Sequence, residues 1–472
     1  MEKNQKGSAI LAILIVLILA IAAAIGAGWY AYRFYSAVPE NIDMPEINFS
    51  AGPELLDENP PDGNEAKEEV EITPETEEPV ASPEPFVEYE TGQDSSPIVS
   101  ATNQFAFELY NQYKNTNDNV FFSPHSISSA LQMTYEGARG KTAEEMRSVF
   151  HFPEDNAARI GSFAKLYEQI NPQNANYRLS TANALWAQND YPFDQNYLKT
   201  VETYYHGKAA NLDFAGNPEN SRQTINQWVS GKTMQKIPEL FAAGTINPLT
   251  RLVLTNAVYF KGKWAIPFEE MLTQEKDFTP STGAKTKCQT MNIKDNFGYA
   301  QTADYQALEL PYEGNGLSMM VILPQTGKMA AVENDLSMEK FAAIKNDLKS
   351  ELANVFLPKF KFDTSYNMNQ TLAKMGMSTA FDDANADFSG MYDKTKTPEN
   401  LYIGLVIHKA YIDVYEEGTE AAAATGVTMQ ATAVMEPPQA KIFNADRPFI
   451  FAIVHNQTGA ILFMGKVNDP TK

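Results

Sequence analysis

Acidic residues and prolines are concentrated in one stretch of this 472-residue chain. Residues 37–100 hold 18 Asp and Glu against a single lysine, Lys67, and they include 10 of the 27 prolines. Without a sustained apolar periodicity, such a stretch cannot bury enough surface to offset the entropy lost on ordering. Charge repulsion and proline also keep it extended. We therefore predict a disordered acidic tether, which carries −17 of the formal net charge of −22.

An uncharged and almost wholly apolar run, residues 8–28, precedes this stretch. A helix of about 20 residues rises roughly 30 Å, the thickness of the hydrocarbon core of a bilayer. Four aromatic residues follow it, as in an interfacial belt: Trp29, Tyr30, Tyr32 and Tyr35. We expect residues 1–36 to form a cytoplasmic N-terminus and a single-pass signal anchor in the cell membrane, with the rest of the chain extracellular. The alternative is a cleaved signal peptide and a secreted protein, although the apolar region of signal peptides is normally only about 7–15 residues long.

Residues 101–472 have an ordinary charge balance, with 33 Lys and Arg against 40 Asp and Glu. No internal repeat or second proline-rich break divides them, so we expect one large domain. The acidic balance argues against binding to nucleic acid, which needs a basic face. Cys288 is the only cysteine and the chain has five histidines, which excludes an intramolecular disulfide and leaves little room for a zinc cluster.

Helix and strand patterns are mixed along this domain. Apolar periodicity predicts helices over residues 104–113 and 126–137, and the capping-box pattern of Thr142 and Glu145 predicts a further helix start. Apolar, β-branched and aromatic runs predict strands over residues 251–260, 308–312, 317–323, 405–415, 448–455 and 460–467. Because helices and strands do not alternate regularly, the sequence favours an α+β fold.

The sequence contains no convincing enzyme motif. Gly140-Lys141-Thr142 resembles the end of a phosphate-binding loop, but Tyr135 stands where that loop requires its first glycine. Neither the Gly-x-Ser-x-Gly nor the His-Glu-x-x-His pattern is present. Cys288 has no sequence neighbour that would activate its thiol. We therefore expect a protein that is not an enzyme and that uses no cofactor or metal.

The segment from Ala421 to Met435 carries no charge and has few aliphatic side chains of the kind that form cores. A flexible, alanine-rich loop is one interpretation. As a strand, however, the segment would place Glu420 on one face and only uncharged residues on the other, namely Thr419, Ala421, Ala423, Thr425, Val427, Met429 and Ala431. Such a face could enter between two existing strands without burying an unpaired charge. The segment is therefore compatible with both an exposed loop and an inserted strand.

This stretch resembles the hinge of the reactive-centre loop in serpins, the strained serine-protease inhibitors, here of a prokaryotic-like kind with an added N-terminal anchor. Further motifs agree with the resemblance, namely Asn119-Val-Phe-Phe-Ser-Pro-His-Ser-Ile127 with Gly137-Ala-Arg-Gly-Lys-Thr142, Asn256-Ala-Val-Tyr-Phe-Lys-Gly-Lys-Trp264 with Phe268, and Phe443-Asn-Ala-Asp-Arg-Pro-Phe-Ile-Phe451 with Gly465-Lys-Val-Asn-Asp-Pro470. The likeness covers about residues 101–472, and not the anchor or the tether.

The resemblance implies three β-sheets, a set of helices and a metastable native state. A protease attacks the loop and forms an acyl-enzyme, and the cut loop then inserts into the main sheet and distorts the protease before deacylation. The hinge would be Glu416, Glu417, Gly418, Thr419, Glu420, Ala421, Ala422, Ala423 and Ala424.

The position of the scissile bond depends on where the count begins. Counting from the hinge places the bond at Thr432–Ala433, whereas counting back from Pro437-Pro438 places it at Val434–Met435. Small or β-branched residues there suit an elastase-like or subtilisin-like protease rather than a trypsin-like one.

The resemblance also implies a polar cluster beneath the strands that open and a tryptophan, Trp264, at the top of the sheet. The cluster residues would be Ser123, Ser126, Asn256 and His408. Taken alone, His408 could equally be a satisfied core histidine and Trp264 a plain core aromatic residue.

The implied partner is a serine protease held in a covalent complex with a monomeric inhibitor. Residues 150–177 contain no cluster of Lys or Arg, so we expect no heparin-like activator. The alternative function is that of a non-inhibitory serpin acting as a binding or carrier protein at the cell surface. Inhibition of cysteine proteases by the same loop also stays open.

Overall fold

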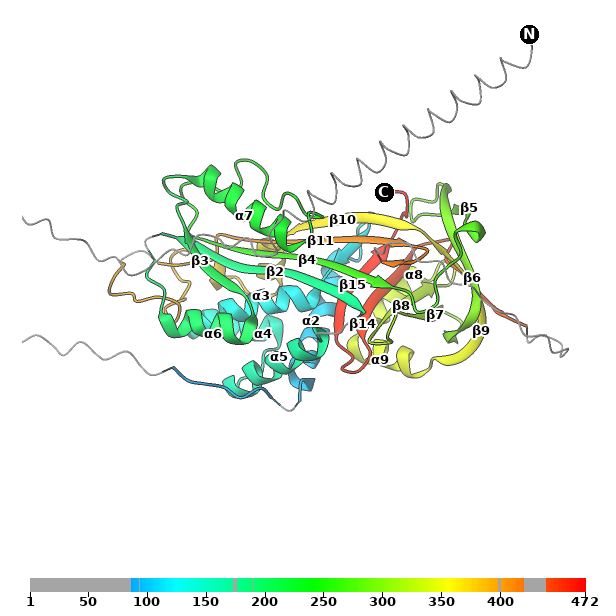
Figure 1. Ribbon diagram of the computed structural model, residues 1–472, viewed down its shortest axis with the longest axis horizontal. Coiled ribbons are helices and arrows are strands. Elements are labelled where there is room, and N and C mark those ends of the chain that lie inside the picture. Colours follow the sequence, from blue (N-terminus) through cyan, green and yellow to red (C-terminus); the bar gives the residue numbers. More distant parts are fainter. Residues whose placement is uncertain (1–85, 93, 173–175, 190, 398–399, 420–438) are drawn as a thin grey trace, which may run out of the picture. The chain divides into compact units, whose positions relative to one another are not determined.

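The computed structural model describes residues 86–472 except 93, 173–175, 190, 398–399 and 420–438 (Figure 1). The described residues belong to one compact unit, Ser82–Lys472. Its helices are α2 (Ser96–Tyr113), α3 (Pro124–Gly137), α4 (Gly140–Phe150), α5 (Asn156–Ile170), α6 (Gln195–Tyr205), α7 (Pro218–Lys232), α8 (Met329–Asp335), α9 (Met338–Asn346) and α10 (Met368–Met375), with the short 3-10 turns η1 (Glu270–Leu272) and η2 (Thr379–Phe381).

A six-stranded sheet, called the main sheet below, runs along the molecule. Its order is β10 (Phe360–Asn367), β11 (Leu405–Tyr415), β12 (Gly418–Thr419), β4 (Leu252–Lys263), β2 (Tyr177–Gln188) and β3 (Lys208–Leu212). The central strands β11 and β4 are parallel and pair directly, from Leu405 with Val253 to Tyr411 with Tyr259. Beyond that point β12 lies between them and pairs with both. The two central strands are thus joined over one part of their length and separated at the other end.

A second sheet has nine strands. Its order is β1 (Val120–Phe122), β15 (Ile461–Val467), β14 (Phe449–His455), β8 (Leu317–Pro324), β7 (Tyr305–Pro311), β6 (Thr286–Gln301), β9 (Lys349–Pro358) and β13 (Lys441–Asn444), and β5 (Gln274–Phe278) also pairs with β6. The 16-residue strand β6 pairs with β5 near its start and with β7 at its end. Through β6, the strands at its two ends belong to one hydrogen-bonded sheet. Two of the three sheets that the resemblance implied are therefore joined here.

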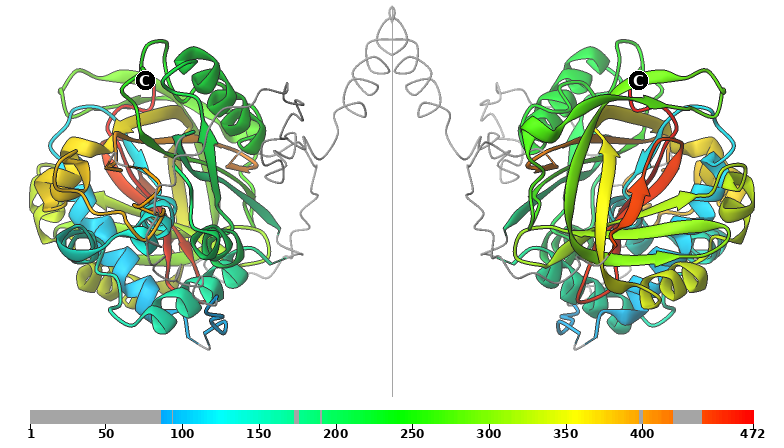
Figure 2. Two further views of the ribbon diagram at one scale, coloured as in Figure 1. Left: turned by 90° about the vertical axis from the view of Figure 1, so that its left-hand side faces the viewer. Right: turned by 90° about the vertical axis from the view of Figure 1, so that its right-hand side faces the viewer.

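The main sheet is covered on both faces. Helix α7 packs on one face, where Ile225 and Val229 meet Trp186 of β2, and α3 with its neighbouring helices lies on the other (Figures 1 and 2). Burial on both faces explains why β4 is an almost continuous apolar run rather than an alternating one.

The elements predicted from periodicity are confirmed, with corrections at two helix starts. Helix α2 begins at Ser96, eight residues before the predicted start at residue 104. Helix α4 begins at Gly140 rather than at Thr142. The Thr142 hydroxyl accepts a hydrogen bond from the Asp387 N–H at 2.9 Å. The Glu145 carboxylate accepts from the N–H of Thr379 at 2.7 Å and from its hydroxyl at 2.8 Å. The predicted capping box is therefore wrong, because partners distant in the sequence take both side chains.

The predicted membrane location requires a correction. Within the part of the chain that the structure describes, no helix has the length and apolar character needed to cross a membrane. The apolar run at residues 8–28, on which the anchor depended, lies outside the described residues. We therefore withdraw the single-pass location, the membrane contact through this run and the extracellular placement that followed from them.

Candidate functional site

The first hinge residues already lie inside the main sheet. Thr419 pairs with Val414 of β11 and with Gly262 of β4. Its side chain is buried, with only 1% of the residue exposed, and its hydroxyl is hydrogen-bonded to the Tyr312 hydroxyl at 2.8 Å. The sequence predicted a segment compatible with a loop and with a strand, and Gly418 and Thr419 have adopted the strand.

Gly418 enters the sheet through a very close approach of two backbones. Its φ is +156°, and a Cβ at this position would lie 2.1 Å from the Gly262 carbonyl oxygen and 2.7 Å from Lys263 Cα. Only glycine permits this contact, because any side chain would collide with the backbone of β4. The position at which the hinge enters the sheet therefore requires a glycine.

Glu416 anchors the chain just before that entry point. Its carboxylate accepts hydrogen bonds from Lys359 Nζ and from the Thr273 hydroxyl, both at 2.7 Å. Its carbonyl accepts from the Phe268 N–H at 2.8 Å. Burial would raise the pKa of the Glu416 carboxyl, but the hydrogen bonds from Lys359 and Thr273 outweigh burial and lower it. The Glu416 side chain is therefore a charged, hydrogen-bonded group at neutral pH.

Trp264 holds the backbone on both sides of Glu416. Its indole Nε1 donates to the Tyr415 carbonyl at 3.0 Å, and its backbone N–H donates to the Glu417 carbonyl at 2.9 Å. The indole also stacks on Tyr312, with 4.6 Å between ring centroids. Trp264 is therefore a core aromatic residue that also holds the backbone of the hinge through two hydrogen bonds.

A polar cluster beneath the main sheet joins the two central strands, and it consists of Ser123, Ser126, Asn183, Asn256 and His408. Nδ1 of His408 in β11 contacts Oδ1 of Asn256 in β4. Asn256 Nδ2 donates to the Ser126 hydroxyl at 2.7 Å and to Asn183 Oδ1 at 2.6 Å. Because β4 and β11 must separate if a strand is to enter between them, this cluster opposes the opening of the sheet.

The sequence analysis missed Asn183, although it predicted the other four residues of the cluster. Asn183 lies in β2 directly opposite Asn256. Only the register of β2 against β4 brings the two residues together, and no motif in the sequence marks that register.

His408 is fully buried and neutral. Its Nε2 accepts a hydrogen bond from the Ser123 N–H at 3.1 Å, so the ring proton lies on Nδ1 and points to Asn256. Burial lowers the pKa of His408 to about 3. Burial also lowers the pKa of His125, on α3, to about 4. Both rings therefore resist protonation in the folded state.

The sequence model of the family described as "Serpin (serine protease inhibitor)" matches residues 100–470 of this chain. The chain is a serpin. Its fold, with the helices and sheets described above, confirms the expected α+β serpin architecture.

Relatives of this serpin include proteins from archaea and from animals. An uncharacterized serpin-like protein of Thermococcus kodakarensis is 45% identical over 380 residues, which cover 80% of this chain and 87% of that protein. The human leukocyte elastase inhibitor is 38% identical, over 79% of this chain and 99% of its own length. Among solved structures, human thyroxine-binding globulin superposes with a TM-score of 0.73 at 28% identity, over 80% of this chain and 100% of that one.

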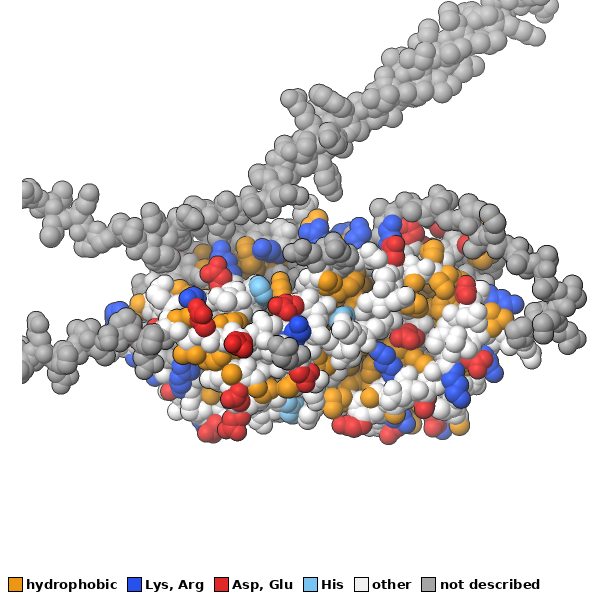
Figure 3. Space-filling model, turned by 60° about the horizontal axis from the view of Figure 1, so that its bottom comes forward, with side chains coloured by type: hydrophobic (Ala, Val, Ile, Leu, Met, Phe, Trp, Pro, Cys, Tyr) orange, Lys and Arg blue, Asp and Glu red, His pale blue; other side chains and the backbone are white. Residues whose placement is uncertain are grey.

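The rest of the predicted loop lies outside the described residues of this serpin. This applies to both positions of the scissile bond, Thr432–Ala433 and Val434–Met435, and to the remaining hinge residues Glu420, Ala421, Ala422, Ala423 and Ala424. Their roles stay predictions. On the face shown in Figure 3, acidic and basic side chains of the described residues are interspersed, and the expectation of no heparin-like activator also stays a prediction.

Proposed function

We propose that this serpin is an irreversible suicide-substrate inhibitor of serine proteases, acting as a trap rather than as an enzyme. The protease serine oxygen would attack the carbonyl carbon of Thr432, and the amide bond to Ala433 would break with Ala433 leaving as a free amine. The resulting ester would hold the protease on the cut loop. Insertion of the loop between β11 and β4 would then distort the protease before water hydrolyses the ester.

The observation that carries this proposal is the double pairing of β12. Gly418 and Thr419 are hydrogen-bonded in register to β11 on one side and to β4 on the other. A strand that has begun in this position can be extended by separating β11 from β4, which replaces one strand pairing by two. Thr419 is the first residue of the uncharged face and is already buried. The residues that follow it on that face also carry no charge, which supports the extension.

The register of β12 also says where the inserted loop would meet the polar cluster. If both pairings continue without a bulge, six residues beyond Thr419 bring Thr425 opposite His408 on β11 and opposite Asn256 on β4. Insertion must break the contact between His408 and Asn256, which would leave buried polar groups unsatisfied. A threonine hydroxyl at that point can both donate and accept, so Thr425 is suited to replace the lost contact.

The residues at the scissile bond support an elastase-like or subtilisin-like target. Thr432 and Val434 are small or β-branched and carry no charge, whereas a trypsin-like pocket requires Lys or Arg. The 38% identity to the human leukocyte elastase inhibitor is consistent with this class of target.

The test is to mix the full chain with neutrophil elastase and, separately, with subtilisin. We expect a complex with each protease that survives SDS, and mass spectrometry of the released C-terminal fragment should identify the cleaved bond. A cleaved loop together with fully active protease in both mixtures would contradict the proposal and favour the binding or carrier alternative.

A further inference from the structure

A segment that precedes the family match lies against two helices. Residues 86–92, called the clasp below, follow α5 and α6 along the helical side of the domain (Figure 1). The Tyr89 N–H donates to the Tyr204 hydroxyl of α6 at 2.6 Å, and the two rings meet edge to face at 5.7 Å. Nζ of Lys199, also in α6, lies 3.8 Å from the centroid of the Phe86 ring. The clasp therefore meets α6 at two aromatic positions.

The clasp meets α5 through a pair of glycines. The Gly92 N–H donates to the Gly161 carbonyl at 2.9 Å. A Cβ on Gly161 would lie 2.8 Å from the Glu90 carbonyl oxygen and 3.0 Å from Gly92 N, and a Cβ on Gly92 would lie 2.9 Å from the Gly161 carbonyl carbon. Glycine inside a helix costs about 1 kcal/mol relative to alanine. The glycine at position 161 is therefore unfavourable for α5 alone and is explained by the backbone that it admits.

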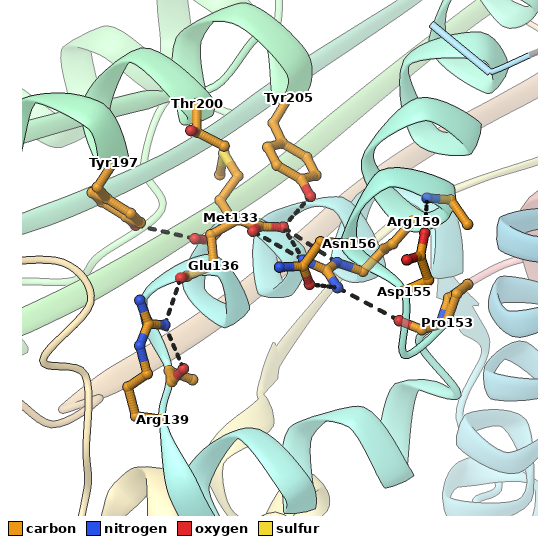
Figure 4. Close-up of polar contacts among 12 residues, drawn as sticks. Met133, Glu136, Arg139, Pro153, Asp155, Asn156, Arg159, Tyr197, Thr200 and Tyr205 are labelled. Carbon is orange, nitrogen blue, oxygen red and sulfur yellow. Dashed lines mark hydrogen bonds and ion pairs between the residues drawn. The ribbon is translucent and has the colours of Figure 1, made fainter. Parts of the chain in front are cut away.

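The same two helices are joined through Glu136 of α3 by a largely buried ionic network (Figure 4). Nη2 of Arg159, from α5, donates to both carboxylate oxygens of Glu136 at 2.8 and 2.9 Å, and Arg159 is 1% exposed. The Tyr205 hydroxyl of α6 donates to the same carboxylate. Burial, followed by the nearby Glu136 charge, raises the pKa of Tyr205 well above its usual value, so the phenol stays protonated. Because this network holds both α5 and α6 against α3, the surface of the two helices that the clasp contacts is fixed in place.

We propose that the outer surface of α5 and α6 is a peptide-docking site, filled in this chain by its own clasp. The site recognises an extended segment with an aromatic residue, a second aromatic residue three positions later and a glycine three positions after that: Phe86, Tyr89 and Gly92. The clasp lies before residue 100, where the family match begins, whereas α5 and α6 lie within that match. This proposal is independent of protease inhibition.

The test uses alanine substitutions in the full chain and measures the melting temperature, Tm. We expect Gly161→Ala to lower Tm by a few degrees, because the new methyl group expels the clasp. In a chain whose clasp is already disabled by Phe86→Ala, Tyr89→Ala and Gly92→Ala, the same Gly161→Ala change should instead raise Tm through its helix propensity. Gly231, inside α7, is the matched control, because a Cβ there meets nothing within 4 Å. Gly231→Ala should raise Tm in both backgrounds.

A second measurement tests docking directly. A fluorescent peptide of residues 82–93 should bind saturably to the clasp-disabled chain. The same peptide with Gly92 replaced by alanine should not bind to that chain. The unchanged peptide should not bind to a clasp-disabled chain that also carries Gly161→Ala. A segment linked to its site acts at an effective concentration of about millimolar. If the clasp is mostly docked, the free peptide must therefore bind with a Kd below that concentration. Absence of binding up to millimolar peptide, or a Tm for Gly161→Ala in the full chain that rises as it does for Gly231→Ala, would overturn the proposal.

Discussion

Replacing Thr419 by arginine is expected to convert this serpin from an inhibitor into a substrate. Thr419 is 1% exposed and faces the Tyr312 hydroxyl at 2.8 Å inside the main sheet. An arginine would be expelled from the sheet in the uncut chain, and the cut loop could then insert only by burying its unpaired charge, at a cost of several kcal/mol. Each 1.36 kcal/mol added to a barrier slows the step tenfold, so a penalty of about 3 kcal/mol would slow insertion by roughly a hundredfold. Deacylation would then be completed before the loop inserts.

The measurement for Thr419→Arg is the fraction of protease held in an SDS-stable complex, compared with the fraction of chain that is simply cleaved. We expect the complex to fall below about a tenth of its normal yield while loop cleavage continues, since the barrier change is large. Thr419→Ser is the matched control, because it keeps the hydroxyl that reaches Tyr312, and it should retain most of the complex. A normal yield of complex from Thr419→Arg would refute the role of the hinge.

Acid is expected to weaken the fold through its buried histidines. The pKa of His408 is lowered to about 3 and that of His125 to about 4, each by burial. Between pH 6.5 and these values the unfolded chain binds protons that the folded chain excludes, so stability falls as the pH falls. Each histidine removes about 1.4 kcal/mol per pH unit in this window. From pH 6.5 to pH 4.5 the two together should cost about 5 kcal/mol.

Urea unfolding between pH 7.5 and 4.5 measures this loss. His408→Gln should remove a large part of the pH dependence, because one of the two histidines with the most strongly lowered pKa is gone. His151→Gln is the control, since His151 pairs with the partly exposed Glu108 at the surface and such pairs contribute little. The interpretation fails if stability is flat over this range, or if His408→Gln has the same slope as the unchanged chain.

Much of the fold follows from short-range patterns in the sequence. The apolar run of β4 and the apolar spacing of α3 predicted their elements, because a strand buried on both faces is apolar almost throughout and a helix packed on a core carries apolar residues at helical spacing. The uncharged alternating face that begins at Thr419 predicted that the hinge could form a strand, and Gly418 and Thr419 do so. The sequence did not reveal that Gly418 and Thr419 would already lie in the sheet, because that depends on the space between Gly262 and Val414.

Contacts between distant residues account for what the sequence did not predict. Thr142 and Glu145 have the spacing of a capping box, but Asp387 and Thr379 bind their side chains. Asn183 joins the polar cluster only through strand register.

The composition of residues 37–100 placed the clasp within an acidic tether. The clasp docks on α5 and α6 through Phe86, Tyr89 and Gly92. Three residues are too few to change the average composition of that stretch.

The central claim, that the cut loop enters between β11 and β4, is tested most directly by the melting temperature before and after a single cleavage within residues 420–438. The full chain should be nicked with a metalloprotease such as thermolysin, which forms no acyl-enzyme and so cannot be trapped, then freed of protease and melted beside the intact chain. A new central strand paired on both sides should raise Tm by at least ~10 °C, and nicked Thr419→Arg should show no such rise. An unchanged or lower Tm in the nicked, unsubstituted chain would contradict the account.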